Sequence, residues 1–173
     1  LATAAERPDR VGHVDVIAGA TPPRADSSAP AVQRLAARLA TSTPSVLGAP
    51  LRGQAWLAEL LGPSFVVDQY TSSAVDEPVP EAVVATVRAD FVEAFAEQPT
   101  GAVTEFRNSA SKWGVDLDEV KPRVDLWYGD SDTNVPVGGA RWLEQELPTA
   151  ELHVLERADH IRTLTGSIPR VLR

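Results

Sequence analysis

Hydrophobic runs and a helical pattern alternate in the last third of the chain. An apolar run over 124–128 ends at Gly129 and is followed by small, polar and acidic residues. A helical pattern over 138–147 comes next, and a second apolar run covers 152–155. Strand, loop, helix and strand in this order are typical of a parallel sheet with a crossover helix. The pattern therefore predicts an α/β fold for this region.

The first residues show a similar alternation. Residues 1–11 have the pattern of the last turns of a helix, which a proline closes. Residues 13–18 then read HVDVIA, with apolar side chains at Val14, Val16 and Ile17. Apolar groups on both faces are typical of a parallel strand that helices cover. We therefore expect a strand at 13–18 in the same sheet.

Residues 25–118 show helical spacing. Apolar positions recur at helical intervals, bounded by Pro, Gly and Ser or Thr signals, in the four segments 32–39, 57–61, 81–95 and 100–110. Residues 62–80 are rich in Ser, Asp and Pro and are expected to form a loop. The expected organisation is an all-helical insert at 25–118 and a partial α/β core made of 1–24 and 119–173.

Several large apolar side chains allow two interpretations. In the insert, Trp56, Phe91 and Phe95 either pack against neighbouring helices or line a substrate pocket. Packing is the usual role of such residues. At the end of the chain, Ile168 and Leu172 are expected to face the core from a short last helix.

A carboxylate and an imidazole follow two of the predicted strands. Asp132 lies just after the strand at 124–128, and His160 lies after the strand at 152–155. Functional groups in such sheets gather at the carboxyl ends of the strands. Each residue also has a plain alternative, because Asp is common in turns and a single His is often a surface residue. Together they match two members of a Ser–His–Asp triad.

The same region resembles the α/β-hydrolase family. The family acid follows a strand in a G-x-x-D pattern with V-P shortly after, which matches Gly129, Asp132 and 135–136. The match assigns the acid role to Asp132 and leaves Asp130 as a turn residue. The family histidine follows the next strand and matches His160.

Two further stretches carry the resemblance. Residues 113–136 are similar to a bacterial subgroup with W-G-F-D-L before the acid strand, and the opening helix matches A-x-A-x-x-x-P-x-R-V. In the family this helix follows the G-x-S-x-G nucleophile elbow, a motif that the present sequence lacks. The residue before the histidine is usually Gly in the family and is Asp159 here. Asp tolerates left-handed backbone better than most residues.

The resemblance implies a fold and an activity. The insert would be a cap or lid over the site, and the substrate would be a small ester, amide or related carbonyl compound. Asp132 would be the triad acid, His160 the base, and the nucleophile would lie upstream. We therefore expect a C-terminal fragment that is inactive alone. Two alternatives stay open: an aspartate nucleophile, as in dehalogenases and epoxide hydrolases, and a hydrolase-fold protein that binds without catalysis.

Composition excludes several classes of function. A net charge of −8 argues against nucleic-acid and anionic-membrane partners, and the absence of cysteine excludes disulfides and thiolate metal sites. No G-x-G-x-x-G motif follows a strand, and no two histidines have metal-site spacing, so no cofactor is expected. His13, which has no acid partner at motif spacing, and His153 are interpreted as structural. Without a signal peptide or a long apolar run, a cytoplasmic location is expected.

The predicted strand at 13–18 bears on association. In the resembling fold it is an interior strand, so without the upstream half one row of its backbone groups has no partner. Such an edge is a template for pairing with another chain. We expect the chain to dock on the N-terminal fragment of the same protein or, failing that, on a homodimer mate.

Overall fold

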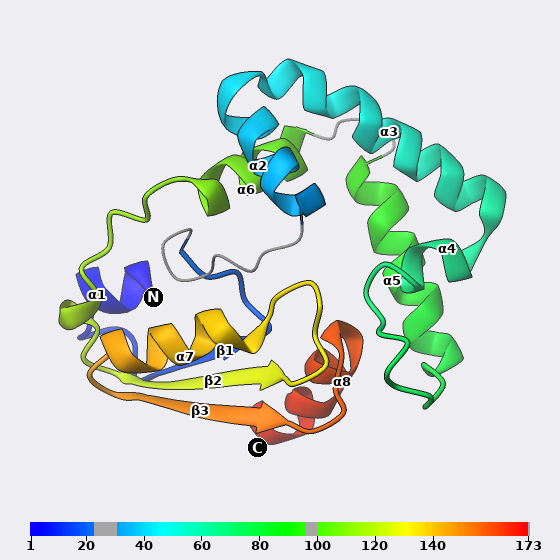
Figure 1. Cartoon of the computed structure of the whole chain (residues 1–173). Coiled ribbons are helices and arrows are strands. Elements are labelled where there is room, and N and C mark those ends of the chain that lie inside the picture. Colours follow the sequence, from blue (N-terminus) through cyan, green and yellow to red (C-terminus); the bar gives the residue numbers. More distant parts are fainter. Residues whose placement is uncertain (23–30, 96–99, 173) are drawn as a thin grey trace.

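The computed structural model describes residues 1–22, 31–95 and 100–172. In this part of the chain, three strands form one parallel sheet in the order β1 (His13–Ile17), β2 (Arg123–Gly129) and β3 (Ala150–Leu155). Helix α7 (Val137–Glu146) connects β2 to β3 and lies against both strands (Figure 1). The α/β class and the parallel strands predicted from the sequence are confirmed.

One face of the sheet is apolar and is covered by α7 and by the short helix α1 (Ala2–Glu6). Val124, Leu126 and Tyr128 of β2 are fully buried in this cluster. The buried Tyr128 hydroxyl donates a hydrogen bond to the carbonyl of Gly19 at 2.7 Å, which satisfies its polar group. Because alternate residues of a strand point to opposite faces, the other face of β2 carries its polar positions.

Helix α8 (His160–Val171) packs against β1 and β2. It buries Ile161 together with Thr163 and Ser167, whose hydroxyls donate to carbonyls one turn earlier. The expectation that Ile168 and Leu172 face the core is wrong, since they are 40% and 80% exposed. The small polar residues of α8 make the close contact with the sheet, and this turns both apolar side chains outward.

In the described residues between β1 and β2 there are five helices, and they lie above the sheet in Figure 1. They are α2 (Ala31–Ser42), α3 (Pro44–Leu61), α4 (Pro63–Val67), α5 (Glu81–Phe95) and α6 (Thr100–Ala110). A short 3-10 turn, η1 (Leu117–Glu119), leads into β2. None of the helices in the described ranges is long and apolar enough to cross a membrane.

The inserted helices have apolar clusters of their own. Leu51 and Val103 form one cluster, and Ala58, Val66 and Phe91 form another. Phe91 is therefore a packing residue. Trp56, by contrast, is 61% exposed.

The expected loop at 62–80 is wrong in its first part, where α4 forms. Pro63 stands at the first helical position, where its fixed φ and missing N–H cost nothing. Val66 and Val67 of this helix are buried. Burial of this apolar pair stabilises a helix that the loop-like composition conceals.

Candidate active site

The loop after β2 holds Asp132. Its Oδ1 accepts hydrogen bonds from the backbone N–H groups of Asn134 at 2.8 Å and Val135 at 2.9 Å. The side chain is completely buried. A buried carboxylate needs such donors, and here they leave its second oxygen to face the β3–α8 loop.

His160 is the first residue of α8, and Asp159 caps that helix. Asp159 Oδ1 accepts from the backbone N–H of Arg162 at 3.0 Å, while Oδ2 accepts from the Arg162 guanidinium. The capping position has φ −83°, so no left-handed backbone is required at Asp159; Arg157, at φ 53°, adopts it instead. Asp at this position therefore acts as a helix cap, which fixes the backbone of His160.

The two loops bring Asp132 and His160 together. Nδ1 of His160 lies 2.9 Å from Oδ2 of Asp132, and the imidazole side chain is 28% exposed. Because an ionised carboxylate only accepts hydrogen bonds, this contact favours the tautomer with a proton on Nδ1. Nε2 of His160 then carries a free lone pair and can accept a proton.

Gly129, at the end of β2, permits this close approach. A Cβ at this position would lie 2.0 Å from the Ala158 carbonyl oxygen and 2.3 Å from Thr163 Oγ1. The same loops are joined by a hydrogen bond from the Ser131 N–H to the Ala158 carbonyl at 3.1 Å. The glycine of the G-x-x-D pattern thus has a packing role, since any larger residue would push the two loops apart.

The segment after α4, residues 69–72, is bound to both loops. Asn134 Nδ2 donates to the Gln69 carbonyl at 2.9 Å, and the Ile161 N–H donates to the Tyr70 carbonyl at 3.4 Å. The Ser72 N–H donates to Asp159 Oδ2 at 3.1 Å. The Tyr70 ring stacks on His160 with centroids 5.8 Å apart, and burial raises the pKa of the Tyr70 hydroxyl. The helical insert therefore restrains both loops of the Asp132–His160 pair.

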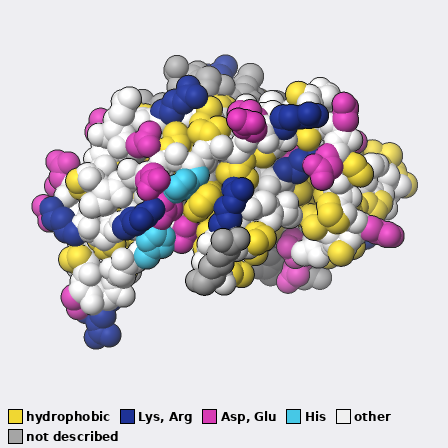
Figure 2. Space-filling model, turned by 90° about the horizontal axis from the view of Figure 1, so that it is seen from below, with side chains coloured by type: hydrophobic (Ala, Val, Ile, Leu, Met, Phe, Trp, Pro, Cys, Tyr) yellow, Lys and Arg dark blue, Asp and Glu magenta, His cyan; other side chains and the backbone are white. Residues whose placement is uncertain are grey.

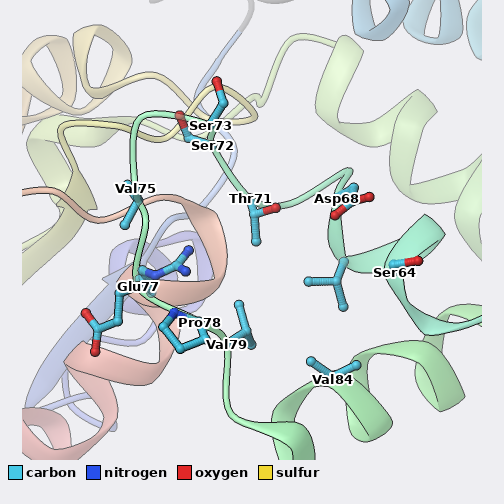
Figure 3. A pocket seen from close by; sticks show the side chains of 12 residues that line it. Ser64, Asp68, Thr71, Ser72, Ser73, Val75, Glu77, Pro78, Val79 and Val84 are labelled. Carbon is cyan, nitrogen blue, oxygen red and sulfur yellow. The ribbon is translucent and has the colours of Figure 1, made fainter.

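A cavity of about 510 Å³ opens beside this segment (Figure 3). Asp68, Thr71, Ser72 and Glu77 line it from the α4–α5 connection, together with Arg162 of α8. Asp132 and His160 are not among its lining residues, but Ser72 and Arg162, which line it, both bind Asp159, the residue before His160. Arg162 also donates from its guanidinium to Asp159 Oδ2, so one side chain links the wall of the cavity to the cap of α8.

The structure brings together Asp132 and His160, which the sequence singled out as candidates, and adds supporting residues that the sequence did not predict. Asp159 had a detectable signal, because Asp directly before a helical pattern is a capping residue. Tyr70 and Arg162 had none, since only the folded chain places them beside the loops. His13 has no acid partner at motif spacing in the sequence, but in the folded chain its Nε2 lies 3.1 Å from a carboxylate oxygen of Asp15 and 3.1 Å from one of Asp125.

Comparison with known proteins gives matches among solved structures alone. No family model matches the chain, and no curated protein does. An α/β-hydrolase fold protein from Nakamurella multipartita matches with a TM-score of 0.56 and 19% identity over 98% of this chain and 62% of its own. Est816, described as an N-acyl homoserine lactone degrading enzyme, gives 0.59 and 17% over 99% and 60%.

A third match is an acetylester hydrolase from Corynebacterium glutamicum, with a TM-score of 0.53 and 17% identity over 98% of this chain and 54% of its own. The chain therefore spans less than two thirds of the length of these structures. At such identities the similarity concerns the fold. The chain has the fold of the C-terminal part of an α/β hydrolase, with helices inserted between two strands of its parallel sheet.

Proposed function

We propose that this chain supplies the acid and the base of a serine-type α/β hydrolase, with Asp132 as acid and His160 as base. The observation that carries the proposal is the 2.9 Å contact between Asp132 Oδ2 and His160 Nδ1. A serine hydroxyl is a poor nucleophile at neutral pH and needs a base to take its proton. Nε2 of His160, with its free lone pair, is suited to that role.

The surroundings of the pair support the second half of the reaction. When His160 takes a proton it becomes cationic, and the buried Asp132 carboxylate stabilises that charge. Two backbone N–H groups fix the carboxylate, so it stays in place while the proton moves. The protonated imidazole then returns its proton to the leaving group. The substrate class that fits this chemistry is an ester, amide or related carbonyl compound.

The nucleophile is proposed to come from outside these residues. Within the described ranges, no hydroxyl is hydrogen-bonded to Nε2 of His160, and the sequence lacks G-x-S-x-G. In the described part of the sheet, β1 pairs with β2 alone, which leaves its outer edge for another strand. We propose that the N-terminal portion of the same protein docks there or, where that portion is absent, a homodimer mate.

The partner of the site itself is proposed to be a small-molecule substrate. A cavity of about 510 Å³ is of a size that holds one.

The test uses the chain with and without the segment encoded upstream of it. The chain alone should hydrolyse p-nitrophenyl esters at the background rate. Co-expression with the upstream segment should restore hydrolysis, and His160→Ala should lower kcat by at least about a thousandfold. His153→Ala is the matched control and should retain activity.

Two outcomes would contradict the proposal. Activity that survives His160→Ala would remove the base role. A folded complex with no hydrolytic activity and a non-nucleophilic residue at the elbow would indicate a binding protein.

A further inference from the structure

Polar side chains from all three strands meet on the sheet face opposite α7. Parallel pairing places Asp15 beside Asp125, Asp125 beside Glu151, and Trp127 beside His153. His13 lies at the start of β1 on the same face. Figure 2, which views the molecule from below, shows histidine side chains grouped here with acidic and basic ones. This cluster lies within the strands, apart from the Asp132–His160 pair.

Three atoms of the cluster converge. Nε2 of His13 lies 3.1 Å from Oδ2 of Asp15 and 3.1 Å from Oδ2 of Asp125. One ligand atom from each of these residues lies within 4.8 Å of the other two. In a tetrahedral zinc site with bonds of about 2.0–2.1 Å, neighbouring ligand atoms are roughly 3.3 Å apart. The spacing around His13 is close to that value.

In both Asp15 and Asp125, the second carboxylate oxygen, Oδ1, is held by an aromatic side chain. Trp127 Nε1 donates to Asp15 Oδ1 at 2.8 Å, and His153 Nε2 lies 2.6 Å from Asp125 Oδ1. The Trp127 and His153 rings stack with centroids 4.1 Å apart. Hydrogen bonds of this kind orient the ligands in metal sites. Here they direct Oδ2 of both carboxylates toward His13.

Charge and exposure also suit a cation. Burial acts to raise the pKa of Asp125, but hydrogen bonds from Arg123 and His153 outweigh it and the pKa is lowered. Arg123 donates to both oxygens of Asp125 at 3.0 Å and to Glu151 at 2.8 Å, and Arg170 lies over the Trp127 ring. The carboxylates of the cluster (Asp15, Asp125 and Glu151) still outnumber its guanidinium groups (Arg123 and Arg170). The Arg123 and His13 side chains are 59% and 43% exposed, so the guanidinium can turn away and an ion can enter.

We propose that His13, Asp15 and Asp125 bind a divalent transition-metal ion of the Zn²⁺ class. One imidazole and two carboxylates suit such ions. Water would complete the coordination on the exposed side, and the ion would displace the Arg123 contact with Oδ2 of Asp125. Sequence spacing conceals the site because its ligands come from strands that are distant in the chain and adjacent in the sheet.

A second set, Asp125, Glu151 and His153, shares one ligand with the first. We assign the ion to the first set for two reasons. Glu151 is paired with Arg123, and His153 already uses Nε2 to hold Asp125. The nitrogen of His13, by contrast, faces two carboxylate oxygens at equal distance.

Titration of the 173-residue chain with ZnCl₂ by isothermal calorimetry tests the proposal. We expect a single ion per chain with a Kd in the micromolar range. His13→Asn and Asp15→Asn should each weaken binding by at least about tenfold. Arg123→Gln should tighten binding, because it removes the competing guanidinium. His160→Asn, the matched control at the other His–Asp pair, should bind zinc as the wild type does.

Circular dichroism of each variant establishes that it is folded, and His13 is exposed enough for Asn to replace it without loss of packing. Absence of zinc binding in the wild type would overturn the proposal, as would unchanged affinity in His13→Asn. A loss in His153→Asn larger than in His13→Asn would place the ion on the second set and overturn the assignment. Weaker binding in Arg123→Gln would contradict the displacement of the guanidinium.

Discussion

Two His–Asp pairs join the regions of β2 and β3, and each links residues 28 positions apart. Asp132 lies in the loop after β2 and His160 at the start of α8, so both members of this pair (the loop pair) lie beyond the strands, whereas Asp125 and His153 (the strand pair) lie within them. The first histidine contacts its carboxylate through Nδ1 and the second through Nε2. Backbone N–H groups hold Asp132, whereas the Arg123 guanidinium holds Asp125.

The difference shows that a His–Asp contact does not by itself specify chemistry. In the loop pair, Nε2 of His160 stays free and uncharged backbone N–H groups hold the carboxylate of Asp132. This arrangement favours proton transfer. In the strand pair, Nε2 of His153 is occupied by the contact with Asp125, and charged groups surround the Asp125 carboxylate. That arrangement favours the binding of a positive charge. Two features therefore decide between proton transfer and cation binding: which ring nitrogen contacts the carboxylate, and which groups hold that carboxylate.

The largest expected effect comes from Gly129→Ala, which should break the loop pair alone. The added Cβ would meet the Ala158 carbonyl oxygen at 2.0 Å, so the loops must separate. We expect a loss of about 2–3 kcal/mol in the free energy of unfolding, measured in urea. Nitrogen NMR shifts should change for His160 and stay constant for His153.

Gly138→Ala is the matched control for this variant. A Cβ at Gly138 would have nothing within 4 Å, and the residue lies in α7. Its stability should stay the same or rise by up to about 1 kcal/mol. Equal stability of the two alanine variants would show that Gly129 does not control the approach of the loops.

A smaller effect is expected for Asp132→Asn, which sharpens the tautomer assignment. The amide can still accept from Asn134 and Val135, but it presents N–H groups to His160. Stability should fall by about 1–2 kcal/mol. The proton of neutral His160 should move from Nδ1 to Nε2, which long-range ¹⁵N–¹H NMR detects. Retention of the Nδ1 tautomer in the variant would contradict a tautomer set by Asp132.

The smallest effect concerns pH and the strand pair. The pKa of Asp125 is lowered in the folded chain, so its contribution to stability is present above the unfolded value of about 3.9 and is lost as pH falls through the lower folded value. In urea unfolding between neutral and acid pH, Asp125→Asn should therefore lose less stability on acidification than the wild type. Parallel curves for the two proteins would refute a role of this carboxylate in acid sensitivity.

The loop pair was open to prediction from sequence, and the strand cluster was not. Gly129, Asp132 and His160 follow strands whose ends are marked by local patterns, and strand ends in a parallel sheet meet at one edge. The partners of His13 depend on which strand lies beside β1 and in what register. No local pattern specifies that, since β1 and β2 are separated by the whole helical insert.

Local sequence patterns also fail to specify which side chains of a helix become buried. The helical segments of the insert were predicted from apolar spacing, whereas α4 was missed because burial of Val66 and Val67 stabilises it. The outward position of Ile168 and Leu172 also depends on packing: Thr163 lies close to Gly129, so α8 presents a small polar face to the sheet. Apolar character alone did not reveal which face would be covered.

The hydrogen bonds of residues 69–72 set a condition on how the helical insert can be exchanged between proteins. Gln69 and Tyr70 contribute carbonyls and Ser72 an N–H, so these three hydrogen bonds depend on the path of the main chain and not on which side chains it carries. A transplanted insert with unrelated helices would be accepted if it returned a backbone segment to this position. An insertion or deletion of one residue here would misalign the donors and acceptors. Modular exchange of the insert is thus limited by the length of this connection more than by its sequence.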